Sequence, residues 1–133
     1  MLPFRVAKPR KLGLPLFILD GHQPVPCESE QDWQTWMKSP ARRVADTRID
    51  DVEVSTVFLG VEHNPNEAGQ ATLFETVVRV RDESRYLDRY PTWDEAMAGH
   101  ERIVGRIRTT MQQDQLGAAA AWDVLAQRDG LTF

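Results

Sequence analysis

β-Branched and aromatic residues are concentrated between Val52 and Val80, in two runs around a polar segment, and this pattern predicts a β-hairpin at the centre of the fold. One arm covers residues 52–63 and the other covers residues 71–80, with a run of turn-forming residues between them. In the first arm both alternating sets of positions are apolar. We therefore expect that arm to be a central strand that is covered on both faces.

Two more strands are predicted before the hairpin. Leu16–Leu19 is a short apolar run that ends in a turn at Asp20, and residues 22–26 after it are extended because of their two prolines. Arg43–Ile49 alternates weakly and is predicted as an outer strand, antiparallel to the first arm of the hairpin. The polar residues 81–90 are predicted as a loop.

Three segments have the periodicity of helices. Ser29 begins a capping-box pattern that opens a short helix, which Pro40 stops. Thr92 begins a second capping box, and residues 93–111 carry an apolar stripe that we expect to lie across the sheet. A third helix, rich in alanine, is predicted over residues 116–128.

These elements predict a single α+β domain over residues 16–111. The domain should contain a mostly antiparallel sheet of about four strands, packed by the long amphipathic helix and flanked by the short one. Residues 1–15 are predicted as a basic N-terminal arm, and residues 112–133 as a C-terminal helical extension.

Composition narrows the class of protein. The chain has 133 residues, of which 41% are hydrophobic and 27% charged, as in an ordinary globular domain. Its formal net charge of −4 argues against nucleic-acid binding, except through the basic arm that contains Arg10 and Lys11. The single cysteine, Cys27, cannot form an internal disulfide, which suits a reducing cytoplasm. No apolar run is long enough to span a membrane.

Histidines and carboxylates are the first candidates for chemistry. His22 and His63 lie at the ends of predicted strands, and together with Asp20 and Glu75 they are the candidates for a small pocket. His100 falls on the apolar stripe, so we expect it to be a packing residue with one hydrogen bond. No two of these residues have the local spacing of metal ligands, so neither a metal site nor a cofactor is predicted.

Glu75 is unusual because it is a charged residue in the middle of a predicted strand. A covered carboxylate needs a partner, since an unpaired buried charge costs several kcal/mol. Arg79 on the same face, or Arg43 or Arg48 on a neighbouring strand, could supply that partner. The alternative is that Glu75 acts as an acid/base group on the floor of a small cleft.

Five short runs of the sequence, in this order, resemble a family of small, uncharacterised proteins encoded by bacteriophages and prophages: ILDGHQPVP (18–26), RRVA (42–45), VSTVFLGVEH (54–63), LFET (73–76) and YPTWDEAMAGH (90–100). The resemblance covers about residues 17–107, and both termini depart from the shorter family pattern. It implies a phage setting, either in the cytoplasm of the bacterial host or in the phage particle. It transfers no functional residue.

We therefore expect a non-enzymatic phage accessory protein that binds a protein partner or forms a homo-oligomer. Its contact residues would be Leu116, Trp122 and Leu125 in the C-terminal helix and Arg10 and Lys11 in the arm.

Two alternatives stay open. One is a small metal-dependent or acid/base enzyme that uses the group containing Asp20, His22, His63 and Glu75. The other is a small-ligand binder, for instance of a nucleotide signal of host defence, which would need Arg43, Arg79 or Arg81 aimed into a cleft.

Overall fold

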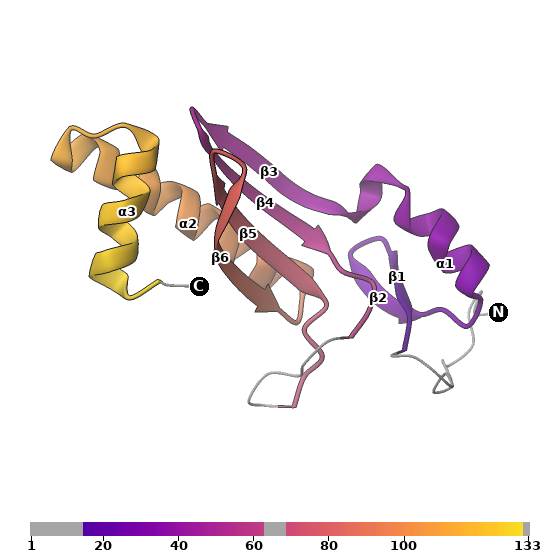
Figure 1. The fold of residues 1–133 in the computed structure, drawn as a ribbon. Coiled ribbons are helices and arrows are strands. Elements are labelled where there is room, and N and C mark those ends of the chain that lie inside the picture. The colour runs from indigo at the N-terminus through magenta and orange to yellow at the C-terminus, as the bar shows by residue number, and fades with distance from the viewer. Residues whose placement is uncertain (1–14, 63–68, 132–133) are drawn as a thin grey trace.

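The computed structural model describes residues 15–62 and 69–131, and they form an α+β fold (Figure 1). A four-stranded antiparallel sheet has the order β3-β4-β5-β6, and β1 and β2 form a separate two-stranded sheet. The elements in chain order are β1 (Phe17–Asp20), β2 (Gln23–Pro26), α1 (Glu30–Met37), the 3-10 helix η1 (Pro40–Arg42), β3 (Arg43–Ile49), β4 (Val52–Phe58), β5 (Phe74–Val80), β6 (Glu83–Tyr90), α2 (Trp93–Asp114) and α3 (Ala118–Asp129).

The predicted hairpin is confirmed as the two inner strands of the large sheet. β4 and β5 pair in register from Val52 opposite Val80 to Phe58 opposite Phe74. The predicted outer strand is also confirmed, because β3 pairs antiparallel with β4 along its length. The sequence pattern therefore located three of the four strands of this sheet.

Within residues 15–62 and 69–131, one face of β4 is buried and the other is only partly buried, so the prediction that β4 is buried on both faces was wrong. Val54, Thr56 and Phe58 are fully buried, whereas Ser55 and Val57 are half-buried. The cause is α2, which contacts all four strands and lies behind the sheet in Figure 1. We call the α2 side the covered face. The other side is the open face, which carries Ser55 and Val57 in β4 and Glu75 and Arg79 in β5.

Residues 81–90 were predicted as a loop, and this was wrong, since they contain strand β6. β6 pairs antiparallel with β5, with Tyr90 opposite Phe74. The turn before it uses Arg81 and Asp82, whose φ angles are 50° and 65°. Tight hairpin turns need positive φ and usually signal it with Gly or Asn. Arginine is not a typical residue of such turns, so the sequence did not predict this hairpin.

The first predicted strand is confirmed, but it pairs outside the main sheet. β1 and β2 form a hairpin with Asp20 opposite Gln23, and Gly21 takes a φ of 62° at the turn. The backbone N–H of Phe17 donates to the carbonyl of Gly60 at 2.8 Å. The hairpin is thereby attached to the chain just after β4.

The three predicted helices are confirmed together with their caps. The hydroxyl of Ser29 accepts from the N–H of Asp32 at the start of α1, and that of Thr92 accepts from the N–H of Glu95 at the start of α2. At the end of α3, Gly130 takes a left-handed conformation with a φ of 67°.

The third helix is part of the chain's own core. Trp122 and Leu125, which were predicted as interface contacts, are each 2% exposed and share a cluster with Ile107 of α2 and Val78 of β5. Leu116 is partly buried against the same cluster. These residues therefore pack inside the chain and do not form an exposed contact surface. The sequence showed a weak apolar seam but not that α2 would cover it.

Candidate anion-binding cleft

The predicted group of Asp20, His22, His63 and Glu75 does not come together where the structure describes it. Asp20 is exposed in the β1–β2 hairpin. His22 stacks on the indole of Trp93, with ring centroids 3.7 Å apart and an interplanar angle of 5°. Glu75 lies on the open face, whereas Trp93 packs against Phe74 on the covered side. His63 lies outside the described residues.

Metal ligands do not gather in this part of the chain either. Within residues 15–62 and 69–131, no group of three or more His, Cys, Asp or Glu side chains could hold a metal ion. Arg10 and Lys11 of the predicted basic arm lie outside the described residues.

Glu75 has a direct partner across the sheet. Its Oε2 accepts from Nε of Arg89 at 3.0 Å, and the two side chains are 14% and 29% exposed. Arg89 sits opposite Glu75 in β6, a strand that the sequence did not reveal. Arg79, which was considered as the partner, is instead 3.4 Å from Glu53. The mid-strand carboxylate is therefore part of a cross-strand ion pair.

His100 is buried and connects α2 to the sheet. Its Nδ1 is 2.8 Å from Oγ1 of Thr56, and its Nε2 is 2.8 Å from Oγ1 of Thr47. Thr56 in turn is 2.5 Å from Oγ1 of Thr76 in β5. The predicted packing histidine thus makes two hydrogen bonds where one was expected. Burial lowers the pKa of His100, with smaller opposing effects of Asp46 and Glu101.

Tyr90 continues this polar row toward β6. Its phenol is hydrogen-bonded to Thr76, and burial is the main cause that raises its pKa to about 12. Gly99 of α2 packs on this ring, and a Cβ there would overlap the phenol. The row separates the α3-side apolar cluster from a second cluster around Phe58 and Phe74. Its hydroxyls and imidazole bind one another, so it acts as a scaffold.

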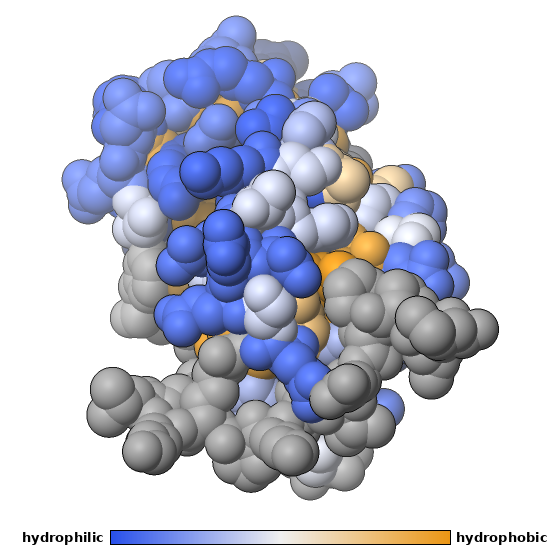
Figure 2. Space-filling view, turned by 90° about the vertical axis from the view of Figure 1, so that its right-hand side faces the viewer, coloured by the Kyte–Doolittle hydropathy of each residue, from blue (hydrophilic) through white to orange (hydrophobic). Residues whose placement is uncertain are grey.

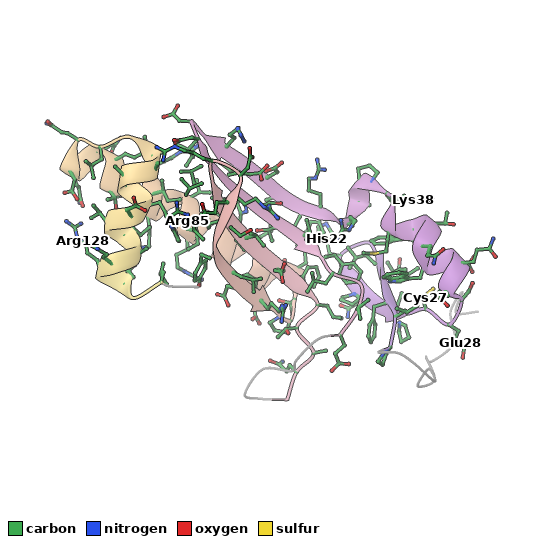
Figure 3. The ribbon with its side chains drawn as sticks, in the orientation of Figure 1. His22, Cys27, Glu28, Lys38, Arg85 and Arg128 are labelled. Atoms are coloured by element: carbon green, nitrogen blue, oxygen red, sulfur yellow. The ribbon has the colours of Figure 1, made fainter. Side chains whose placement is uncertain are left out.

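On the open face, a cleft of about 450 Å³ lies where the α1–η1 segment meets β3, β4 and β5. Its lining is mostly polar: Met37, Lys38, Ser39, Pro40, Arg42, Arg43, Asp46, Glu53, Ser55, Val57 and Arg79. Figure 3 labels Lys38 at the C-terminal end of α1, far from Arg85 and Arg128 beside α3. Viewed from the α1 end, the coloured surface is largely hydrophilic (Figure 2).

Local sequence explains how α1 and η1 are held beside the sheet. The indole Nε1 of Trp33 donates to the carbonyl of Gly60 at 3.0 Å. Gly60 has a φ of 75°, and a Cβ there would lie 2.7 Å from Sδ of Met37, so only glycine permits this approach. Ser39 caps η1 through the N–H of Ala41. The chain then enters β3 through Arg43, where the register shifts.

The cleft has more positive than negative side chains. Lys38, Arg42, Arg43 and Arg79 line it, whereas Asp46 and Glu53 are its acidic residues. Arg79 is paired with Glu53 at 3.4 Å. In the part of the chain that the structure describes, the other three cations form no ion pair. No carboxylate of residues 15–62 and 69–131 therefore neutralises their positive charge.

Arg42 is the most unusual of these side chains. One end of its guanidinium is used, because Nη2 donates to the carbonyl of Phe58 at 3.2 Å. Its Nε is buried and has no hydrogen-bond partner in the part of the chain that the structure describes. A buried donor without an acceptor costs about 1–3 kcal/mol, and more for a charged group. A ligand oxygen would relieve that cost.

Only part of this site was predicted from the sequence. Arg43 and Arg79 were considered for a ligand cleft and do line it, but Arg81 pairs with Asp51 at 3.0 Å and lies outside the lining. Arg42 and Lys38 were missed. The RR pair at the start of a predicted edge strand was the one signal in the sequence that points to this place.

No helix in residues 15–62 and 69–131 is both long and apolar enough to cross a membrane. Compared with protein-family models, with curated proteins and with solved structures, the chain matches none.

Proposed function

We propose that this protein binds a small anionic ligand in the cleft between the α1–η1 segment and the open face of the sheet. The observation that carries the proposal is Arg42: among the described residues its buried Nε has no acceptor and its guanidinium has no carboxylate partner. Arginine stays charged at all physiological pH values, and its planar donors match the oxygens of a phosphate or carboxylate. Such an anion would accept a hydrogen bond from Nε of Arg42 and would neutralise the charge of its guanidinium.

The surroundings of Arg42 support this proposal. Lys38 and Arg43 add two cations that form no ion pair with other described residues, and anions are attracted to such a local excess of charge. The volume of about 450 Å³ falls in the range of about 300–1,000 Å³ that is typical of small-molecule sites. The lining includes no histidine or cysteine. We propose binding because the cations without described ion pairs in the cleft are groups that hold an anion.

This proposal takes up the small-ligand alternative that the sequence left open. The expected protein-binding role loses the support of Trp122 and Leu125, because both are buried within the chain. The phage setting stays a prediction, and so does a role in the host cytoplasm or in the particle.

Calorimetric titration with inorganic phosphate and pyrophosphate at low ionic strength tests the proposal. Arg43→Ala removes an exposed cleft cation that forms no ion pair with the described residues, so the fold should persist. We expect the affinity to fall about tenfold, since one charge-assisted hydrogen bond contributes about 1.5 kcal/mol or more.

Arg108→Ala is the matched control, because it removes the same charge from an exposed position on α2 that is not part of the cleft lining. Its affinity should equal that of the wild type. Absence of binding to the wild-type protein, or equal losses in the two variants, would contradict the proposal.

A further inference from the structure

The cleft contains hydrogen-bond acceptors as well as cations. Asp46 in β3 lies directly opposite Ser55 in β4, so their side chains are neighbours on the open face. Glu53 lies two residues before Ser55 in β4, on the same face, and it also lines the cleft. An ionised carboxylate only accepts hydrogen bonds, so it repels a phosphate but attracts a hydroxyl group. These residues therefore suit an uncharged, hydroxyl-bearing part of a ligand.

The cations and the acceptors occupy different positions along β4. Arg43 sits opposite Val57, next to η1 and Arg42, whereas Asp46 sits opposite Ser55. Two residues of a strand span roughly 7 Å. The distance is comparable with that between a phosphate group and the more distant hydroxyls of the sugar that carries it. Arg79, farther along, is already paired with Glu53 at 3.4 Å.

The lining also indicates what the cleft does not recognise. Its apolar side chains are Met37, Pro40 and Val57, and none of the residues that line it is aromatic. Proteins that hold nucleobases commonly stack them on aromatic rings. A volume of about 450 Å³ is much more than a single inorganic anion needs, since a water molecule takes about 30 Å³ in the liquid.

We infer that the ligand is a phosphate monoester of a polyhydroxylated molecule, that is, a sugar phosphate. Lys38, Arg42 and Arg43 bind the phosphate. Asp46 and Ser55 bind the hydroxyl groups. The inference rests on the proposed function, because it assigns the anion of that site to a chemical class.

Titration calorimetry with four probes tests the inference: inorganic phosphate, ribose 5-phosphate, ribose and adenosine 5′-monophosphate. Ribose 5-phosphate should bind at least tenfold more tightly than inorganic phosphate. Ribose alone should not bind measurably. The nucleotide should bind no more tightly than ribose 5-phosphate, because its base adds no contact.

Asp46→Asn keeps the size of the side chain but removes its charge, and Asp46 is exposed, so the variant should fold. It should lose most of the tenfold preference for ribose 5-phosphate while its affinity for inorganic phosphate stays equal or rises. Asp82→Asn is the control, because Asp82 is an exposed turn residue with a φ of 65°, a conformation that Asn also accepts. This control should bind all four probes like the wild type.

The outcomes separate the two proposals. If inorganic phosphate binds and ribose 5-phosphate binds no more tightly, the inference is overturned and the proposed function stands. A nucleotide that binds clearly more tightly than ribose 5-phosphate also overturns the inference, in favour of base recognition. If neither phosphate nor ribose 5-phosphate binds, both proposals fail together.

Discussion

The two faces of the sheet differ in whether the buried polar side chains on them have hydrogen-bond partners. On the covered face, His100, Thr56 and Thr76 are buried and satisfy one another by hydrogen bonds. On the open face, Glu75 pairs with Arg89 and Arg79 pairs with Glu53, but the buried Nε of Arg42 has no acceptor. Buried polar groups that stabilise a fold normally have hydrogen-bond partners. Among the described residues, Nε of Arg85 in β6 is also buried without a hydrogen bond, but it lies 3.5 Å from Oε1 of Glu83. Arg42 has no described carboxylate partner, and this difference distinguishes the cleft from the scaffold.

The largest expected effect comes from breaking the covered face. His100→Ala leaves the hydroxyls of Thr47 and Thr56 without their imidazole partner and opens a cavity under α2. We expect the free energy of unfolding to fall by about 3 kcal/mol, as for other losses of a buried hydrogen-bonded group. Urea unfolding followed by circular dichroism measures this change.

His22→Ala is the comparison for that variant, because His22 is exposed and loses only its stack on Trp93. Its free energy of unfolding should fall by less than about 1 kcal/mol. Equal losses in the two histidine variants would mean that the buried row is not the scaffold.

Two glycines of α2 sharpen the comparison, because they differ only in what faces them. A Cβ at Gly99 would overlap the phenol of Tyr90, whereas a Cβ at Gly105 would have nothing within 4 Å. Gly99→Ala should reduce the free energy of unfolding by about 2 kcal/mol through overpacking. Gly105→Ala should increase it by about 0.5–1 kcal/mol, because alanine favours the helix. Thermal melts that show the same sign for both would contradict this packing.

The loss of stability at acid pH depends on His100 of the same buried row. Burial lowers the pKa of His100 in the folded protein below its value of about 6.5 in the unfolded chain. The unfolded state therefore binds more protons just below pH 6.5, so stability falls as the pH falls through this window until the folded pKa is reached. One proton gives a slope of at most about 1.4 kcal/mol per pH unit.

The difference between the wild type and His100→Asn isolates this slope, because carboxylates contribute equally to both proteins. The wild type should lose stability more steeply than the variant as the pH falls below about 6.5. Parallel curves for the two proteins would show that His100 is not the titrating group.

Local sequence signals predicted the elements, whereas the cleft depends on contacts between distant segments. Ser29 and Thr92 could be recognised as caps because a helix start needs only neighbouring residues. β6 was missed because its turn uses Arg81 and Asp82 at positive φ, where Gly or Asn would have been expected. Without β6, the partner of Glu75 could not be found.

The cleft was hidden for a related reason. Its cations come from the end of α1, from η1 and from two different strands, and they meet only because α1 docks on Gly60. The missing acceptor of Arg42 depends on the burial of a single atom. Neither property has a sequence pattern of its own.

The most direct test of the central claim is an NMR titration with inorganic phosphate that follows the arginine side-chain Nε–H signals. The claim predicts that the signals of Arg42 and Arg43 shift together and reach a plateau as phosphate is added. The signals of Arg85 and Arg108 should show no such saturating shift. Small, unsaturated shifts spread over all arginines, with no distinct response of Arg42, would contradict it.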